Sequence, residues 1–259
     1  MFPDLFSIGP FTIHTYGMFV ALGFFAGLGA TIKIGKSMGI GHQQVLDMGF
    51  LIILAAIIGS RMLYILMNIS YYVQRPIEIL WIWEGGLVFS GGIIAVALVV
   101  AWYGKRHDLS FLKLGDLLVP GAALGQGIGR IGCLMAGCCY GKPTHVKWGI
   151  IFTHPNSLAP NNICLHPTQL YSSISGFLIF LILLFVHSKK KFEGQVLMWF
   201  LICHSTARLA IERFRGDHRG MVLNSNMTMT QFVATLILVV SVIVLLVLKS
   251  RNRRKSQTG

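Results

Sequence analysis

Seven stretches of this chain are long and apolar enough to cross a lipid bilayer, and they constrain its fold more than any other feature. One helical crossing needs about 20 apolar residues. Stretches of this kind lie at 11–34, 46–67, 87–103, 114–136, 168–187, 194–213 and 229–248. With 54% hydrophobic and only 12% charged residues, the composition does not fit a water-soluble domain. We therefore predict an all-α, polytopic membrane protein with seven transmembrane helices.

The basic residues follow a topology pattern rather than a nucleic-acid surface. The formal net charge is +13, from 22 Lys and Arg against 9 Asp and Glu. If the N-terminus lies outside, thirteen basic residues fall in inward-facing segments, six in outward-facing segments and three inside predicted helices. This asymmetry is typical of the positive-inside rule. It predicts an external N-terminus, a cytoplasmic C-terminus, a short basic tail from about residue 249, and no nucleic-acid partner.

The first ten residues, MFPDLFSIGP, contain no Lys or Arg and no small-residue cleavage pattern. A removable signal peptide is therefore not expected, and the first helix should remain in the protein. The sequence shows no repeat and no long hydrophilic segment. We expect a single integral membrane domain over residues 1–259.

The polar residues within the apolar stretches are predicted to meet at one depth. Consecutive helices run in opposite directions, so residues late in one helix and early in the next lie at the same level. On this basis the outer half collects Tyr16, Arg61, Tyr64, Glu84, Ser90, Arg130, His166, Gln169, Arg208 and Glu212. At about 1.5 Å of rise per residue, Arg61 and Arg130 lie roughly 10 Å below the outer helix ends.

Arginines at this depth need partners. Glu84 and Glu212 could form structural ion pairs with them, but two carboxylates cannot neutralise Arg61, Arg130 and Arg208 together. A net positive cavity favours an anionic substrate that carries a phosphate, because a guanidinium matches phosphate oxygens with two parallel hydrogen bonds.

Small residues recur at four-residue steps around Arg130. They are Gly121, Gly125, Gly129, Gly137 and Gly141, with Cys133 at the remaining step. A ridge without side-chain bulk lets neighbouring helices approach closely. We expect this packing to hold the backbone of Arg130 while its side chain faces the cavity.

The cysteines do not predict a metal site. Cys133, Cys138 and Cys139 lack the C-x-x-C spacing of zinc sites, and two adjacent cysteines rarely point at one ion. A disulfide from Cys164 to Cys138 or Cys139 is an open alternative to simple packing. His14 and His166 lie at the depth of the cavity and are candidates for proton transfer.

Six motifs occur in an order that resembles the prolipoprotein diacylglyceryl transferase family. They are IHTYG at 13–17, GSRMLY at 59–64, GGLVFSGG at 85–92, GRIGCLMAGCCYG at 129–141, HPTQLY at 166–171 and RLAIERFRGD at 208–217. The resemblance covers nearly the whole chain and implies a multi-pass enzyme of the bacterial plasma (inner) membrane, with its active site towards the outer leaflet.

The resemblance also implies a reaction and its participants. The diacylglyceryl group of phosphatidylglycerol would pass to the thiol of a cysteine in the signal region of a lipoprotein precursor, forming a thioether and releasing glycerol phosphate. No metal or other cofactor is implied. By similarity, Arg130 and Arg208 are essential arginines and Tyr16 is an important tyrosine. His14 and His166 join them as catalytic candidates because of their depth. The predicted substrate-binding residues are Arg61, Ser90, Gly91, Gly92, Gln169, Tyr171 and Glu212.

Two positions depart from the family pattern. Many members have asparagine where this chain has Cys133, and many have a histidine, proposed as the base, where this chain has Ser90. A serine hydroxyl is a poor base near neutral pH, so His14 and His166 are the available bases, His14 being favoured because it lies two residues from Tyr16. The alternative function is a transporter or channel for an anionic lipid or small organic anion, because buried arginines also line such pathways.

Overall fold

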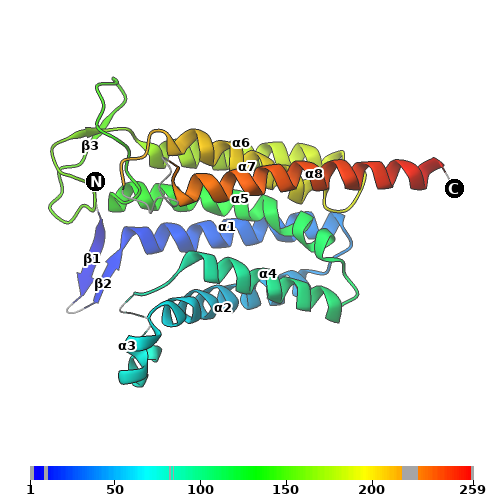
Figure 1. Cartoon of the computed structure of the whole chain (residues 1–259), viewed down its shortest axis with the longest axis horizontal. Coiled ribbons are helices and arrows are strands. Elements are labelled where there is room, and N and C mark those ends of the chain that lie inside the picture. The colour runs from blue at the N-terminus through cyan, green and yellow to red at the C-terminus, as the bar shows by residue number, and fades with distance from the viewer. Residues whose placement is uncertain (1–2, 9–10, 82, 84, 218–226, 258–259) are drawn as a thin grey trace. The chain divides into compact units, whose positions relative to one another are not determined.

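The computed structural model describes the chain except residues 1–2, 9–10, 82, 84, 218–226 and 258–259 (Figure 1). The described residues form eight α-helices and one 3-10 helix: α1 Thr15–Ser37, α2 His42–Met67, α3 Ile69–Gln74, η1 Pro76–Leu80, α4 Phe89–Arg106, α5 Phe111–Ala136, α6 Thr168–Ser188, α7 Gln195–Glu212 and α8 Met229–Gln257. They also form four short strands: β1 Asp4–Ile8, β2 Phe11–His14, β3 Ile150–Ile151 and β4 Cys164–Leu165. The chain divides into two compact units, one made of Met1–Thr31 with Gly115–Gly259 and the other of Ile32–Leu114.

The mostly helical fold is confirmed, and the five helices α1, α2, α5, α6 and α8 are long and apolar enough to cross a membrane within the described residues. The other two predicted spans coincide with α4 and α7, which are helices of 18 residues each. Neither helix has a mean hydropathy as high as that of the five. Lys105 and Arg106 end α4, whereas Arg208 and Glu212 lie in the last turns of α7.

The first predicted helix begins later than expected. Residues 11–14 form β2, which pairs antiparallel with β1 in a hairpin, and α1 starts only at Thr15. The prediction of helix from residue 11 was wrong because hydropathy alone does not separate an apolar strand from a helix. The sequence Phe-Thr-Ile contains aromatic and β-branched residues that favour a strand.

The predicted basic tail from about residue 249 is helical up to Gln257. Helix α8, drawn in red in Figure 1, runs from Met229 to Gln257 without a break. The residues Lys-Ser-Arg-Asn-Arg-Arg that follow the apolar part contain no glycine or proline, so nothing in them terminates a helix.

In the unit formed by residues 32–114, α2 packs against α4. The two backbones meet at Gly59 and Gly91, where a side chain on either residue would collide with the backbone of the other. Gly92 lies one residue further, and a β-carbon there would lie 3.1 Å from the carbonyl oxygen of Ala56. This close approach is typical of membrane helices that pair through small residues.

In the other unit, α5 contacts helices on two faces through glycines. A β-carbon at Gly125 would lie 2.8 Å from the carbonyl oxygen of Gly23 in α1, and one at Gly176 in α6 would lie 2.8 Å from the Cα of Gly127. The predicted close packing therefore exists at Gly121 and Gly125, whereas Gly129 has nothing within 4 Å. Gly137 and Gly141 lie beyond the end of α5, so they do not belong to a helical ridge.

An apolar core also holds α5, α6 and α7 together. Its buried members are Val119, Ala123, Ile179, Leu183 and Val196. Helix α7 also packs against α8. The ends of α5, α6 and α7 are thereby fixed relative to one another.

Candidate functional site

The loops between the helix ends join into a small framework in the unit that contains α5. The segment 140–144 lies between two others: Gly141 donates to the carbonyl of His166 at 3.1 Å, and Lys142 donates to the carbonyl of Phe214 at 2.8 Å. Leu134, Phe152, Ala159 and Leu165 form a buried core beneath it. The end of α5, the start of α6 and the end of α7 therefore meet in one place, as the predicted depth of their polar residues requires.

Arg130 lies near the end of α5 and contacts the loop that follows it. Its Nη1 atom donates to the Sγ atom of Cys139 at 3.5 Å. Two residues later, a β-carbon at Gly132 would lie 3.3 Å from the Cα of Tyr16 in α1. The structure thus brings Arg130 and Tyr16, both predicted catalytic residues, to the same end of this unit.

Arg208 and Glu212 form an ion pair one helical turn apart on α7. Nη2 of Arg208 lies 3.0 Å from Oε2 of Glu212, and Oε1 of Glu212 accepts a hydrogen bond from Thr228 at 3.1 Å. Glu212 therefore neutralises one of the three helix arginines, which is the structural ion pair considered from the sequence. Glu84, the other predicted acidic partner, lies outside the described residues.

His204 lies one turn before Arg208 and was missed by the sequence analysis. The positive charges of Arg208 and Arg130 both act on its imidazole. The missed signal was helical spacing, since positions 204, 208 and 212 recur every four residues and share one face of α7. This residue also shows that Arg130 and Arg208 belong to one electrostatic environment.

His14 is held by a carboxylate. Its Nδ1 atom lies 2.7 Å from Oδ1 of Asp4, and Asn156 donates to the other oxygen of Asp4 at 3.1 Å. The hydrogen bonds from Asn156 and His14 hold the pKa of Asp4 below its usual range. A carboxylate on Nδ1 fixes the orientation of the ring and leaves Nε2 available for proton transfer.

His166 belongs to an aromatic cluster. Its Nδ1 atom lies 3.3 Å from the hydroxyl of Tyr171, which accepts a hydrogen bond from the indole of Trp148 at 2.8 Å. The ring of Phe214 lies 5.1 Å from the ring of His166. Tyr171, predicted to bind substrate, is therefore connected to His166 at the start of α6.

Gln169 contacts the turn that follows α5. It is buried, and its Nε2 atom donates to the backbone carbonyl of Cys138 at 2.8 Å, while the hydroxyl of Thr168 donates to the carbonyl of Cys139 at 2.7 Å. The start of α6 thus supports the turn after α5. Gln169, a predicted substrate-binding residue, holds the backbone of this turn through its amide NH₂ group.

All five cysteines are free. The disulfide considered from the sequence between Cys164 and Cys138 or Cys139 is not formed, because Cys164 packs against Gly149 in the hairpin of β3 and β4. Cys138 and Cys139 instead gather with Cys133, and their three Sγ atoms all lie within 4.8 Å of one another.

Arg215 follows α7, in a segment predicted to face outward, and it is buried. Its side chain is 2% exposed and makes two hydrogen bonds to Asp217, at 2.8 and 2.7 Å. Its guanidinium also acts on the sulfur of Cys139. The sequence signal was the Arg-Gly-Asp spacing, which places opposite charges on either side of a flexible residue.

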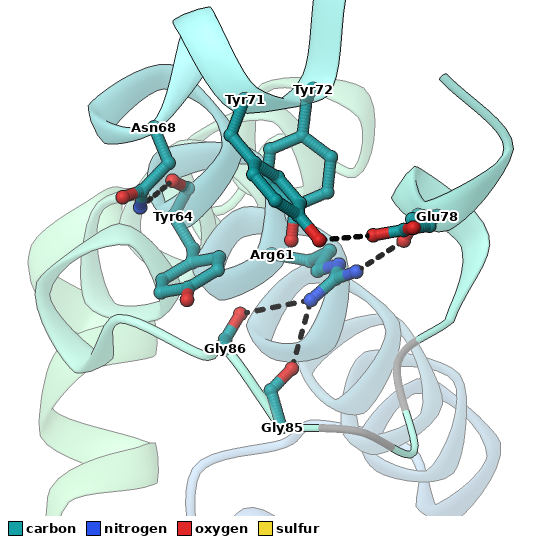
Figure 2. Close-up of a pocket in the computed structure, with 8 residues that line it drawn as sticks. All are labelled: Arg61, Tyr64, Asn68, Tyr71, Tyr72, Glu78, Gly85 and Gly86. Carbon is teal, nitrogen blue, oxygen red and sulfur yellow. Dashed lines mark hydrogen bonds between the residues drawn. The ribbon is translucent and has the colours of Figure 1, made fainter. Parts of the chain in front are cut away.

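The unit formed by residues 32–114 holds Arg61 in a network of carbonyls, shown in Figure 2. Its guanidinium donates to the carbonyls of Glu78 at 2.6 Å and Gly85 at 2.8 Å, both drawn in Figure 2. It also donates to the carbonyl of Ile79 at 3.1 Å. The rings of Tyr64 and Tyr72 lie 5.8 and 5.4 Å from its central carbon. The donors of Arg61, a predicted substrate-binding residue, are directed to the backbone in this structure.

A pocket of about 290 Å³ lies beside this network. It is lined by Arg61, Tyr64, Asn68, Tyr71, Tyr72, Glu78, Gly85 and Gly86. The hydroxyl of Tyr71 donates to Glu78 at 2.7 Å and accepts from Arg75 at 3.2 Å. The wall of the pocket is therefore both aromatic and polar.

Ser90, Gly91 and Gly92 lie in the first turn of α4. Ser90 is exposed, whereas both glycines are buried against α2. The glycines, predicted to contact substrate, have a packing role in the structure. The side chain of Ser90 is accessible, as are those of Leu87 and Phe89 in the same motif.

Comparison of the sequence with known proteins shows the family of this chain. The sequence profile of the family described as prolipoprotein diacylglyceryl transferase matches residues 3–247. A protein of Clostridium tetani named phosphatidylglycerol–prolipoprotein diacylglyceryl transferase is 39% identical over 244 residues, covering 94% of this chain and 96% of the relative. A relative in Bordetella avium with the same name is 32% identical and covers 90% of this chain and 89% of its own. The chain belongs to the prolipoprotein diacylglyceryl transferase family.

Proposed function

We propose that this protein transfers the diacylglyceryl group of phosphatidylglycerol to the thiol of a cysteine in the signal region of a lipoprotein precursor, the first step of lipoprotein maturation. The observation that carries this function is the family match over residues 3–247, which contains every motif quoted above. The precursor sulfur forms a bond to the glyceryl carbon. The bond from that carbon to the phosphate oxygen breaks, and glycerol phosphate leaves with the electron pair.

Positive charge assists this displacement in two ways. A free thiol, with a pKa near ~8.5, is only slightly ionised at neutral pH, and nearby guanidinium groups favour its thiolate. The same groups stabilise the charge that develops on the departing phosphate. Arg130 and Arg208 suit this role because the positive charges of both act on the imidazole of His204, so both charges reach one place. Glu212, paired with Arg208, orients that guanidinium.

We assign the base to His14, with His166 as the alternative. His14 has the Asp4 carboxylate on Nδ1, which favours the tautomer with a free Nε2 atom. Nδ1 of His166 faces the hydroxyl of Tyr171, which can donate or accept and therefore does not fix one tautomer. Ser90 orients a substrate or a water, because a hydroxyl needs another group to take its proton.

The protein is an integral membrane protein with five apolar helices in its described part. We further propose that α4 and α7 complete a set of seven spans in the bacterial plasma membrane, with the N-terminus outside and the C-terminus cytoplasmic. The bias of basic residues towards the inward-facing segments supports this orientation. The site then faces the outer leaflet, where phosphatidylglycerol and the precursor meet it.

The function is tested with purified protein, phosphatidylglycerol and a peptide that contains the precursor cysteine. Mass spectrometry should detect a gain equal to one diacylglyceryl group on the peptide. A matched peptide with serine in place of the cysteine should show no gain. A transporter or channel would leave both peptides unmodified, and that result would refute the proposed reaction.

A further inference from the structure

Three cysteine sulfurs meet where α5 ends. Cys133 lies on the last full turn of the helix and is buried, and Cys138 and Cys139 follow directly after the helix. The Sγ atoms of all three lie within 4.8 Å of one another. Neither the family match nor the proposed reaction requires a cluster of thiols at this place.

The backbone explains how two adjacent cysteines face the same point. In extended chain, neighbouring side chains point to opposite sides. Here Gly137 has a φ of 75° and Cys139 a φ of 60°, so the chain turns back towards α5 immediately after the helix. A left-handed conformation is uncommon for a residue with a β-carbon and persists only where surrounding contacts hold it.

Those contacts are present on the opposite side of the turn. Gln169 and Thr168 donate to the carbonyls of Cys138 and Cys139, at 2.8 and 2.7 Å. Both side chains are buried. The strained turn is therefore fixed by α6, and the three sulfurs are positioned before any ligand arrives.

We propose that Cys133, Cys138 and Cys139 together bind one thiophilic metal ion of the d¹⁰ class, of which Zn²⁺ is the commonest. Thiolates are the preferred ligands of such ions. With metal–sulfur bonds of about 2.3 Å, tetrahedral geometry places the sulfurs roughly 3.8 Å apart. The three Sγ atoms lie within 4.8 Å of one another, so small changes in the side-chain torsion angles bring them to this spacing.

The charges around the cluster fit this ligand. Three thiolates and one divalent cation leave a net charge of −1. Arg130 donates to the sulfur of Cys139 at 3.5 Å and supplies the compensating positive charge. Arg215 also acts on this sulfur but is already paired with Asp217, so the whole site approaches neutrality. Hydrogen bonds to ligand atoms of this kind orient metal ligands.

The site provides three protein ligands and leaves a fourth position open. Among the described residues, the cluster includes no fourth cysteine, histidine or carboxylate. Structural zinc sites are usually closed by four protein ligands, whereas sites that bind an exchangeable ligand keep one position open. A water or an incoming thiol is the ligand that fits this position.

Metal binding is measured on the purified full chain in detergent, with all thiols reduced and no substrate present. Titration with Co²⁺, a spectroscopic substitute for Zn²⁺, should produce a sulfur-to-cobalt charge-transfer band that saturates at one ion per chain and is abolished by added Zn²⁺. Each of Cys133→Ser, Cys138→Ser and Cys139→Ser should weaken binding by at least about tenfold, because even outer contacts of a metal site contribute that much. Cys164→Ser and Cys203→Ser are matched controls and should bind as the unchanged protein does.

Circular dichroism and gel filtration show whether each variant is folded. Because Cys133 is buried, Cys138→Ser carries the test if Cys133→Ser does not fold. The absence of a charge-transfer band, or a band that persists in a folded Cys138→Ser or Cys139→Ser variant, would overturn the proposal. The measurement involves no transfer reaction, so its result is independent of the proposed function.

Discussion

Asp116 links α5 to the start of α7, and its removal tests how the helices that carry the candidate site are held. The carboxylate is fully buried and accepts hydrogen bonds from the backbone N–H groups of Gly194 and Leu197, both at 2.7 Å. Lys190 lies 2.9 Å from the same carboxylate. Since the first N–H groups of a helix have no partners within it, Asp116 satisfies them from a neighbouring helix.

The cost of losing this side chain follows from the contacts. Asp116→Ala leaves two buried N–H groups unsatisfied, at about 1–3 kcal/mol each, so we expect a loss of about 3–5 kcal/mol in the free energy of unfolding. Asp116→Asn keeps one oxygen acceptor but loses the second acceptor and the charge, and it should lose about 2–3 kcal/mol. Asp47→Asn is the matched control, because Asp47 is exposed and accepts one hydrogen bond from Gln43. It should change the free energy of unfolding by less than about 0.5 kcal/mol.

Equilibrium unfolding in mixed micelles of a neutral detergent and SDS, followed by circular dichroism, provides these free energies. Hydrogen exchange at the amides of Gly194 and Leu197 provides a local measure, and it should accelerate in both Asp116 variants. If Asp116→Asn and Asp47→Asn were equally stable, the buried carboxylate would not hold the start of α7, and the reasoning from burial and hydrogen bonds would be wrong.

Three further predictions concern the reaction and the topology. Arg130→Lys and Arg208→Lys should each lower turnover of the peptide about tenfold to a hundredfold at equal expression, because lysine keeps the charge but loses the two-point match to phosphate. Near-normal rates in both variants would show that neither arginine binds the phosphate. Ser90→Ala should keep substantial activity. His14→Ala should lose activity mainly below about pH 8, where the thiol is protonated, and regain part of it as the pH rises. An inactive Ser90→Ala variant beside a fully active His14→Ala variant would refute the assignment of the base to His14. Reporter fusions at Lys190 and at the C-terminus should be cytoplasmic and one in the loop between β3 and β4 external, and the opposite result would invert the orientation.

Much of the helical framework could be predicted from hydropathy, because each long apolar segment has few alternatives to a helix in a bilayer. The ends of the helices were harder to predict. The N-terminal hairpin depends on pairing between β1 and β2, and this pairing competes with helix formation in residues that hydropathy scores alike. The last apolar helix continues into its basic end because no residue there breaks it.

The sequence indicates the depth of the candidate site residues better than their contacts. The depth of Arg130 near the outer end of its helix follows from residue count alone, because consecutive helices are antiparallel. Arg61 shows where this reasoning stops, since its guanidinium binds the carbonyls of Glu78, Ile79 and Gly85 in irregular segments. Backbone acceptors of this kind have no sequence signature, so the sequence could not predict these contacts of a buried arginine.

The cysteines show the same limit in the backbone itself. Spacing rules for metal ligands treat adjacent cysteines as diverging, which holds for strands and helices but not for a left-handed residue. The flanking glycines in Gly-Cys-Cys-Tyr-Gly indicate a tight turn, yet only the contacts of Thr168 and Gln169 fix its conformation. Because Arg130 contacts Cys139 at 3.5 Å, any change in this turn also changes the position of the guanidinium. The turn after α5 therefore connects the packing of α6 to the arginine on which we expect the reaction to depend.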